Sequence, residues 1–280
     1  MKLRTLFEGG APERIATGFQ FTEGPVWHDD HLRFSDIPAG IIYALHSDGQ
    51  VSRWRDPSGH SNGLTRSRSG ALIACEHGNR RVSISAGHGQ PKTLIDRYDG
   101  KRLNSPNDVI VRSDGVVFFT DPPYGIEESA QEQPVNGVYA VHPDGTVLRI
   151  AEDFIRPNGL ALSPDEKTLY IDDSRRRHVR AFALAADGRI SNGRVLCNMD
   201  HPQPGSPDGM KVDEAGHLYV AGATGIWVFE PDGTCLGVIA MPELPANCAW
   251  GDADRKTLYI TARTSVYRIR TTTPGMRVCA

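Results

Sequence analysis

Short apolar runs of strand length recur along the chain, and helical periodicity is almost absent. Val109–Val111 and Val116–Thr120 are two such runs, separated by the turn Ser113-Asp114-Gly115. Similar turns ending in Asp-Gly occupy residues 47–49, 143–145, 186–188 and 231–233. With 29 glycines and 19 prolines, the chain can end a strand every few residues. This pattern predicts an all-β protein.

The strand pairs form a repeat. Each unit opens on a polar or acidic residue followed by Gly or a small residue, then a short strand, a turn and a second strand rich in Tyr, Phe and Ile. The six unit starts are Glu23, Asn62, Asn107, Asn158, Asp208 and Asn247. Their separations of 39, 45, 51, 50 and 39 residues are close to the ~40–50 residues of a four-stranded propeller blade. We therefore predict a six-bladed β-propeller with a central channel, forming one domain over residues 1–280. A β-sandwich with coincidental turn spacing is the alternative.

The second strands of the units support this repeat. The stretches 168–173, 217–222 and 257–262 are near-copies, TLYIDD, HLYVAG and TLYITA. Residues 31–36 and 116–121 are looser versions of the same sequence. Equivalent strands in successive blades explain these similarities.

The unit starts also carry chemistry. The innermost strand of each propeller blade lines the channel, so these six residues should form one ring around the axis. The ring holds two carboxylates and four amides, and neither His nor Cys. Such oxygen ligands suit one divalent cation, calcium first, then magnesium or manganese, with zinc the least suited. The alternative is that Asn and Asp serve as turn formers. Six residues in phase, including Glu23, a poor turn former, favour a site.

The composition excludes several functional classes. The chain is 39% hydrophobic and 23% charged, and its net charge is −3. It therefore has no net positive charge that would attract nucleic acid or an anionic membrane. No apolar run approaches the ~20 residues of a membrane span, and residues 1–18 lack the apolar core of a signal peptide. Five widely spaced cysteines favour a reducing compartment. We expect a cytoplasmic monomer or homodimer acting on a small molecule.

Five longer stretches are specific enough to indicate a family: EGPVW (23–27), NSPNDVIVRSDGVVFFTDPPYG (104–125), PNGLALSPDEKTLYIDDS (157–174), PDGMKVDEAGHLYVAG (207–222) and NCAWGDADRKTLYITA (247–262). They resemble the senescence marker protein / gluconolactonase / luciferin-regenerating enzyme family, and its bacterial gluconolactonases most closely. The resemblance runs from about Glu23 to Ile269. It implies a six-bladed propeller with one catalytic divalent cation in the channel, often calcium, and hydrolysis of sugar lactones.

The resemblance also implies roles for individual residues. The implied metal ligands are Glu23, Asn158, Asp208 and Asn107, and the counterpart of Asn107 contacts metal or substrate depending on the family member. Arg102 is implied as a sugar contact, but its spacing to Asn107 differs from the usual family pattern. Asn104 is therefore an alternative to Asn107 as the substrate contact.

We predict a metal-dependent sugar lactonase that converts an aldono-lactone to the aldonic acid. The cation would act as a Lewis acid on the carbonyl. Asp208 is the candidate base, with another group or a metal-bound hydroxide as the alternative, because coordination lowers carboxylate basicity. Asn62 and Asn107 would contact the sugar, and Tyr124 and Glu127 or Glu128 would line the mouth. A diisopropyl fluorophosphatase-like organophosphate hydrolase is the first alternative function, and a non-enzymatic propeller scaffold is the second.

Overall fold

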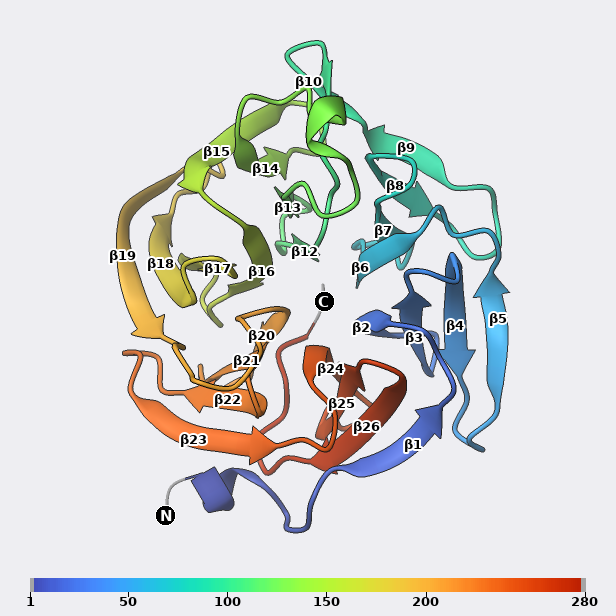
Figure 1. Ribbon diagram of the computed structural model, residues 1–280, viewed down its shortest axis with the longest axis vertical. Coiled ribbons are helices and arrows are strands. Elements are labelled where there is room, and N and C mark those ends of the chain that lie inside the picture. The colour runs from blue at the N-terminus through green and yellow to red at the C-terminus, as the bar shows by residue number, and fades with distance from the viewer. Residues whose placement is uncertain (1–2, 278–280) are drawn as a thin grey trace.

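Six four-stranded antiparallel sheets surround one axis in the computed structural model, which describes residues 3–277 (Figure 1). The predicted all-β, six-bladed propeller is confirmed. Two 3₁₀ helices, η1 (Leu3–Leu6) and η2 (Glu128–Ala130), lie outside the blades, as does the hairpin of β10 (Arg97–Tyr98) and β11 (Lys101–Arg102). Within the described range, no helix has the length and apolar character needed to span a membrane.

Each blade runs outward from the axis, mostly in chain order. Blade 1 contains β2 (Thr22–His28), β3 (His31–Asp36), β4 (Ile41–Leu45) and β5 (Val51–Arg55). Blade 2 contains β6 (Ser61–Arg66), β7 (Leu72–Glu76), β8 (Arg81–Ser85) and β9 (Lys92–Ile95). Blade 3 contains β12 (Val109–Val111), β13 (Val117–Asp121), β14 (Asn136–Val141) and β15 (Val147–Phe154).

The second half of the ring repeats this arrangement. Blade 4 contains β16 (Pro157–Leu162), β17 (Thr168–Asp173), β18 (His178–Leu184) and β19 (Ile190–Asn198). Blade 5 contains β20 (Met210–Val212), β21 (Leu218–Gly222), β22 (Gly225–Phe229) and β23 (Cys235–Ala240). Blade 6 contains β24 (Pro245–Gly251), β25 (Thr257–Ala262), β26 (Ser265–Arg270) and, as its outermost strand, β1 (Glu13–Thr17).

The hydrophobic core is divided among the interfaces between neighbouring blades. Alternate residues of a strand face opposite neighbours, because side chains of a β-strand alternate between its two faces. In β13, Phe119 packs with Ile73 and Cys75 of blade 2, whereas Phe118 packs with Leu160 of blade 4. Both phenylalanines are fully buried, and burial of such a side chain contributes roughly 1.5–3 kcal/mol. Apolar runs without polar alternation are thus explained by sheets covered on both faces.

The ring is closed by the N-terminal strand. Strand β1 pairs antiparallel with β26, with Glu13 opposite Arg268 and Thr17 opposite Ser265. Beyond β26, Thr271 forms an isolated bridge with Phe7, and the Thr272 amide donates to the Leu6 carbonyl at 2.9 Å. The two ends of the chain therefore complete blade 6 together.

The strand limits agree with the sequence expectation in part. Strands β3, β17 and β25 coincide with the expected segments 31–36, 168–173 and 257–262. The first strand of blade 3 does not open on Asn107, however, because β12 begins at Val109. Likewise β13 begins at Val117 and not at Val116. Asn107 belongs to the segment that leads into its strand.

Candidate functional site

The predicted ring residues lie where the inner strand of each blade departs from regular pairing. In blades 1, 2, 4 and 6 the register with the second strand shifts at or beside Glu23, Asn62, Asn158 and Asn247. Asn107 and Asp208 precede their strands, and their amides still donate to the carbonyls of Thr120 at 2.8 Å and Ala221 at 3.0 Å. Irregular pairing of this kind re-aims a side chain. It lets strands that are buried on both faces present polar groups at the axis.

Glycine follows four of the six ring residues because adjacent blades approach closely there. A β-carbon at Gly159 would lie 2.2 Å from the Asp208 carbonyl oxygen and 2.8 Å from Asp172 Oδ2. No side chain fits in that space. The polar-residue-then-glycine pattern of the sequence thus reflects contact between successive inner strands.

Hydrogen bonds connect the ring residues across blade boundaries. Asn247 Nδ2 of blade 6 donates to Glu23 Oε2 of blade 1 at 3.1 Å. Asn158 of blade 4 lies close enough to the Asp208 carboxylate of blade 5 to lower its pKa, and its Nδ2 donates to Ser174 Oγ at 3.1 Å. The charge of Glu23 also raises the pKa of Asp208, so the structure brings Glu23, Asn158 and Asp208, three of the predicted metal ligands, near one another.

Four acids share this part of the channel: Glu23, Asp108, Asp172 and Asp208. Burial, followed by the charge of Asp108, raises the pKa of Glu23 to about 7. Burial and then the charges of Glu23 and Asp108 raise the pKa of Asp208 well above its ordinary value. The pKa of Asp172 is raised in the same way by burial and by Asp208. The acids penalise one another's ionisation, as carboxylates sharing one site do.

These acids fit a bound cation. Asp108 Oδ2 and Asp172 Oδ1 are buried and have no hydrogen-bond partner among the described residues. Unpaired carboxylate oxygens in a buried site are costly unless a cation or proton accompanies them. Across residues 3–277, no three His, Cys, Asp or Glu side chains form a ready-made metal cluster. The four predicted ligands include only two carboxylates, with two amides, so they do not count as such a cluster. Their carboxylate and amide oxygens are nevertheless the ligand atoms that calcium prefers.

Two of the expected substrate contacts lie at the mouth of the ring. Asn62 Nδ2 lies 3.3 Å from Nε2 of His77, and burial lowers the pKa of His77 to about 4. Tyr124 lies close enough to Ser174 and Asp208 for both to affect its pKa, which burial raises to about 12. The Gly125 amide donates to Ser105 Oγ at 3.0 Å, which fixes the loop carrying Tyr124.

Three of the other four predicted contacts lie away from the ring. Asn104 is fully buried, and its Nδ2 donates to the carbonyls of Asp121 at 3.1 Å and Val135 at 3.2 Å. Arg102 belongs to the β10–β11 hairpin, where its amide donates to Glu132. Glu127 is exposed at the start of η2. Within residues 3–277, none of these three side chains hydrogen-bonds a residue of the ring, so their substrate roles stay predictions.

Sequence reasoning missed three charged residues of the site. Asp108 occupies the position where four other blades carry glycine, and Asp172 is the last residue but one of the strand β17. Lys211, on β20, places Nζ 4.0 Å from Asp108 Oδ2. The acid at position 108 is visible in the repeat as a departure from the glycine pattern. No comparable signal marks Asp172 or Lys211.

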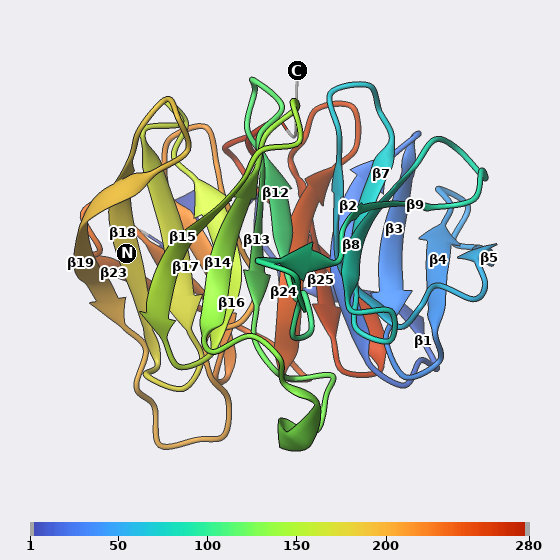
Figure 2. The same ribbon diagram turned by 90° about the horizontal axis from the view of Figure 1, so that it is seen from above.

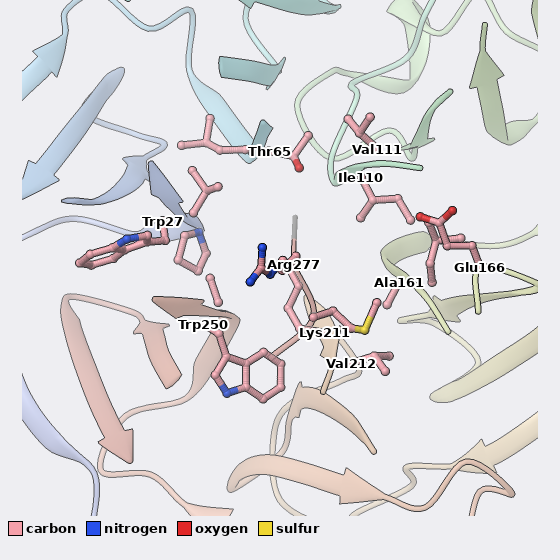
Figure 3. Close-up of a pocket in the computed structure, with 16 residues that line it drawn as sticks. Trp27, Thr65, Ile110, Val111, Ala161, Glu166, Lys211, Val212, Trp250 and Arg277 are labelled. Atoms are coloured by element: carbon pink, nitrogen blue, oxygen red, sulfur yellow. The ribbon is translucent and has the colours of Figure 1, made fainter. Parts of the chain in front are cut away.

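The opposite end of the channel is apolar. A cavity of about 90 Å³ there is lined by residues of all six inner strands, including Val26, Leu64, Ile110 and Trp250 (Figure 3). The C-terminal segment covers this end: the Met276 amide donates to the Val212 carbonyl at 3.2 Å, and Arg277 lies near the axis. The segment that leads to Met276 and η2 lie on opposite sides of the propeller (Figure 2). Tyr124, which precedes η2 in the chain, is exposed.

Comparison with known proteins adds independent evidence. Residues 21–264 match the SMP-30/Gluconolactonase/LRE-like region. A gluconolactonase from Zymomonas mobilis is 38% identical over 292 positions, covering 94% of this chain and 82% of that protein. A pentonolactonase from Haloferax volcanii is 28% identical, covering 88% of this chain and 83% of that protein. The structure of a gluconolactonase from Xanthomonas campestris superposes with a TM-score of 0.89 at 34% identity, covering 96% of this chain and 92% of that one.

Proposed function

Because the chain belongs to the SMP-30/gluconolactonase/LRE-like family, we propose that it is a hydrolase of sugar lactones that converts an aldono-lactone to the aldonic acid. The gluconolactonase and pentonolactonase relatives, similar over most of their length, support this activity. The observation that carries the proposal is that Glu23, Asn158 and Asp208 lie near one another in the channel, away from its apolar end. These relatives do not favour the organophosphate or scaffold alternatives.

The proposed site holds one divalent cation. Glu23, Asn107, Asn158 and Asp208 would hold it, with calcium preferred for this oxygen donor set over magnesium, manganese or zinc. When bound, such a cation supplies a Lewis acid for the lactone carbonyl. The raised pKa values of Glu23 and Asp208 support this assignment, because burial and the neighbouring carboxylates outweigh the effect of the Lys211 charge on Glu23.

Hydrolysis adds water across the ring C–O bond of the lactone. The oxygen of water bonds to the carbonyl carbon, and the ring oxygen leaves as a hydroxyl after taking up a proton. Asp208 is positioned by Asn158 and remains partly exposed, so it is the candidate to accept the proton of the attacking water. Its raised pKa makes it a stronger base than an ordinary carboxylate, although coordination to a cation would oppose that effect.

The polar mouth suits a neutral polyhydroxy substrate. Asn62 and Asn107 offer amides to sugar hydroxyls, and Tyr124 adds an aromatic ring that Arg156 overlies at 4.9 Å. His77 beside Asn62 is neutral near pH 7, because its pKa lies well below that value. It can therefore accept or donate one hydrogen bond without adding charge. The cytoplasmic location and the monomeric or homodimeric state stay predictions.

The test is acid release from glucono-1,5-lactone and from a pentono-1,4-lactone, with spontaneous hydrolysis subtracted. The protein is first treated with chelator, and calcium, magnesium, manganese and zinc are then restored one at a time. Asp208→Asn should lose at least about 10²-fold in kcat, whereas Asp254→Asn on the exposed rim should retain wild-type activity. No rate above background on either lactone with any cation, from a folded protein, would contradict the proposal.

A further inference from the structure

Lys211 places an ammonium group beneath the acids of the ring. It follows Asp208 by three residues and lies on the inner strand of blade 5. Its Nζ lies 4.0 Å from Asp108 Oδ2 and donates to the Met210 carbonyl at 2.9 Å. Its side chain also lines the apolar cavity at the covered end (Figure 3). The ammonium thus lies at the boundary between the apolar cavity and the polar ring.

Asn247 connects Lys211 to Glu23. Its Oδ1 accepts a hydrogen bond from the Cys248 amide at 2.9 Å and a longer one from Lys211 Nζ at 3.4 Å. Its Nδ2 donates to Glu23 Oε2. The Cys248 amide alone is sufficient to orient the Asn247 side chain, because a backbone N–H can only donate. Loss of Lys211 should therefore leave Asn247 and Glu23 in place and remove mainly a charge.

We propose that Lys211 is a built-in cation that limits how tightly the ring binds its divalent cation. This inference rests on the proposed function in assigning a divalent cation to the ring. Asp108 is the acid nearest to the ammonium and acts electrostatically on both Glu23 and Asp208. A fixed positive charge in this cluster opposes a second positive charge, and the interaction is strong where water is partly excluded. The same positive charge makes the site less negative and so reduces its repulsion of the oxyanion that develops during lactone opening.

The experiment measures the dissociation constant of calcium by titration calorimetry after removal of bound metal. Lys211→Met should bind calcium at least about ten-fold more tightly than the wild type, because the opposing charge is gone. Lys211→Gln should show the same tightening, because it keeps a polar head but no charge. Lys211→Arg keeps the charge and should bind as the wild type does. Lys92→Met, in the outer strand β9 of blade 2, is the surface control and should also be unchanged.

Kinetics provide a second readout. At saturating calcium, Lys211→Met and Lys211→Gln should lower kcat for the lactone several-fold with little change in KM, and Lys211→Arg should restore it. A purely structural role would instead weaken calcium binding in Lys211→Met, and that result would overturn the inference. Affinity equal to wild type in both neutral variants would overturn it as well.

The same titration separates this inference from the function on which it rests. If the wild type binds calcium and hydrolyses lactones but the neutral variants bind no more tightly, only the role of Lys211 fails. If the wild type binds no divalent cation and keeps full activity in chelator, the metal-dependent function fails together with it.

Discussion

Gly24 lies directly against Asn62 of the next blade, so that a β-carbon at position 24 would lie 2.0 Å from the Asn62 carbonyl oxygen. The backbone at Gly24 also has a positive φ of 50°. The contact joins blades 1 and 2 at the level of the ring, because Gly24 directly follows the predicted metal ligand Glu23 and Asn62 is a predicted substrate contact. Neither backbone can move aside without displacing Glu23 or Asn62.

Gly24→Ala should therefore lower the free energy of unfolding by more than the unfavourable backbone conformation of an alanine at positive φ would by itself. Gly49→Ala is the matched control, because Gly49 also has a positive φ but its β-carbon would meet nothing within 4 Å. Overpacking costs roughly 1–3 kcal/mol, and we expect Gly24→Ala to exceed Gly49→Ala by at least that amount. Urea unfolding of both variants measures the difference. Equal stabilities would show that the two blades can separate freely at this point.

Asn104 and Asn107 should respond differently to replacement by alanine. Asn104 is buried and bonded to backbone carbonyls of blade 3, so Asn104→Ala should lower the free energy of unfolding by about 1–3 kcal/mol. Asn107→Ala should reduce calcium affinity and kcat while changing stability little. Unfolding curves and calcium titrations of the two variants provide the comparison. Loss of activity in a stable Asn104→Ala protein would make Asn104 the substrate contact.

Stability in chelator should fall as pH rises from about 4 to about 7. Burial raises the pKa values of Glu23 and Asp121 to about 7, so both acids bind a proton more tightly in the folded than in the unfolded chain. The unfolded chain then gains from deprotonation in this window and the folded chain does not. Each acid should contribute a loss on the order of 2–4 kcal/mol. Calcium should reverse the contribution of Glu23 and leave that of Asp121, which Asp121→Asn should abolish. A melting temperature in chelator that is independent of pH would contradict this expectation.

His77 should act in the opposite direction. Burial, with a smaller effect of His60, lowers the pKa of His77 to about 4 from an ordinary 6.5. Its contribution to stability is therefore complete above pH 6.5 and is lost as pH falls toward 4. Between pH 6.5 and 5 the loss should be on the order of 2 kcal/mol. His77→Gln should remove this acid sensitivity, whereas His88→Gln, at an exposed position, should retain it.

Most of the fold and the outline of the site could be predicted from local sequence features. Turns ending in Asp-Gly and near-copies such as residues 168–173 and 257–262 report on single blades, and their spacing gives the blade number. The ring could be predicted because the same irregularity in each inner strand puts Glu23, Asn158 and Asp208 in phase. That phase is visible in the sequence as a polar residue followed by glycine.

The rest of the site depends on contacts between blades, which local patterns do not encode. Asp172 is the last residue but one of β17, beside Asp173, which holds the strand-terminal position of Asp36 and Asp121. Only the packing of blade 4 against blade 5 brings Asp172 to Asp208. Lys211 reads as an ordinary polar position in a short strand, and its neighbour Asp108 is more than 100 residues away. Asn104 and Asn107 look equivalent in the sequence but differ in what surrounds them.

The closure of the ring by β1 has a consequence for the site. Glu23 lies in the inner strand of blade 1, and Asn247 lies in the inner strand of blade 6. The hydrogen bond between them spans 224 residues of sequence and joins the first blade to the last. Blade 6 is incomplete without β1, so the same closure of the ring that pairs β1 with β26 also places Asn247 beside Glu23. A cation held by Glu23 together with Asn107, Asn158 and Asp208 would tie the first blade to the third, fourth and fifth. Glu23 would thus serve both the contact between the first and last blades and the binding of the cation.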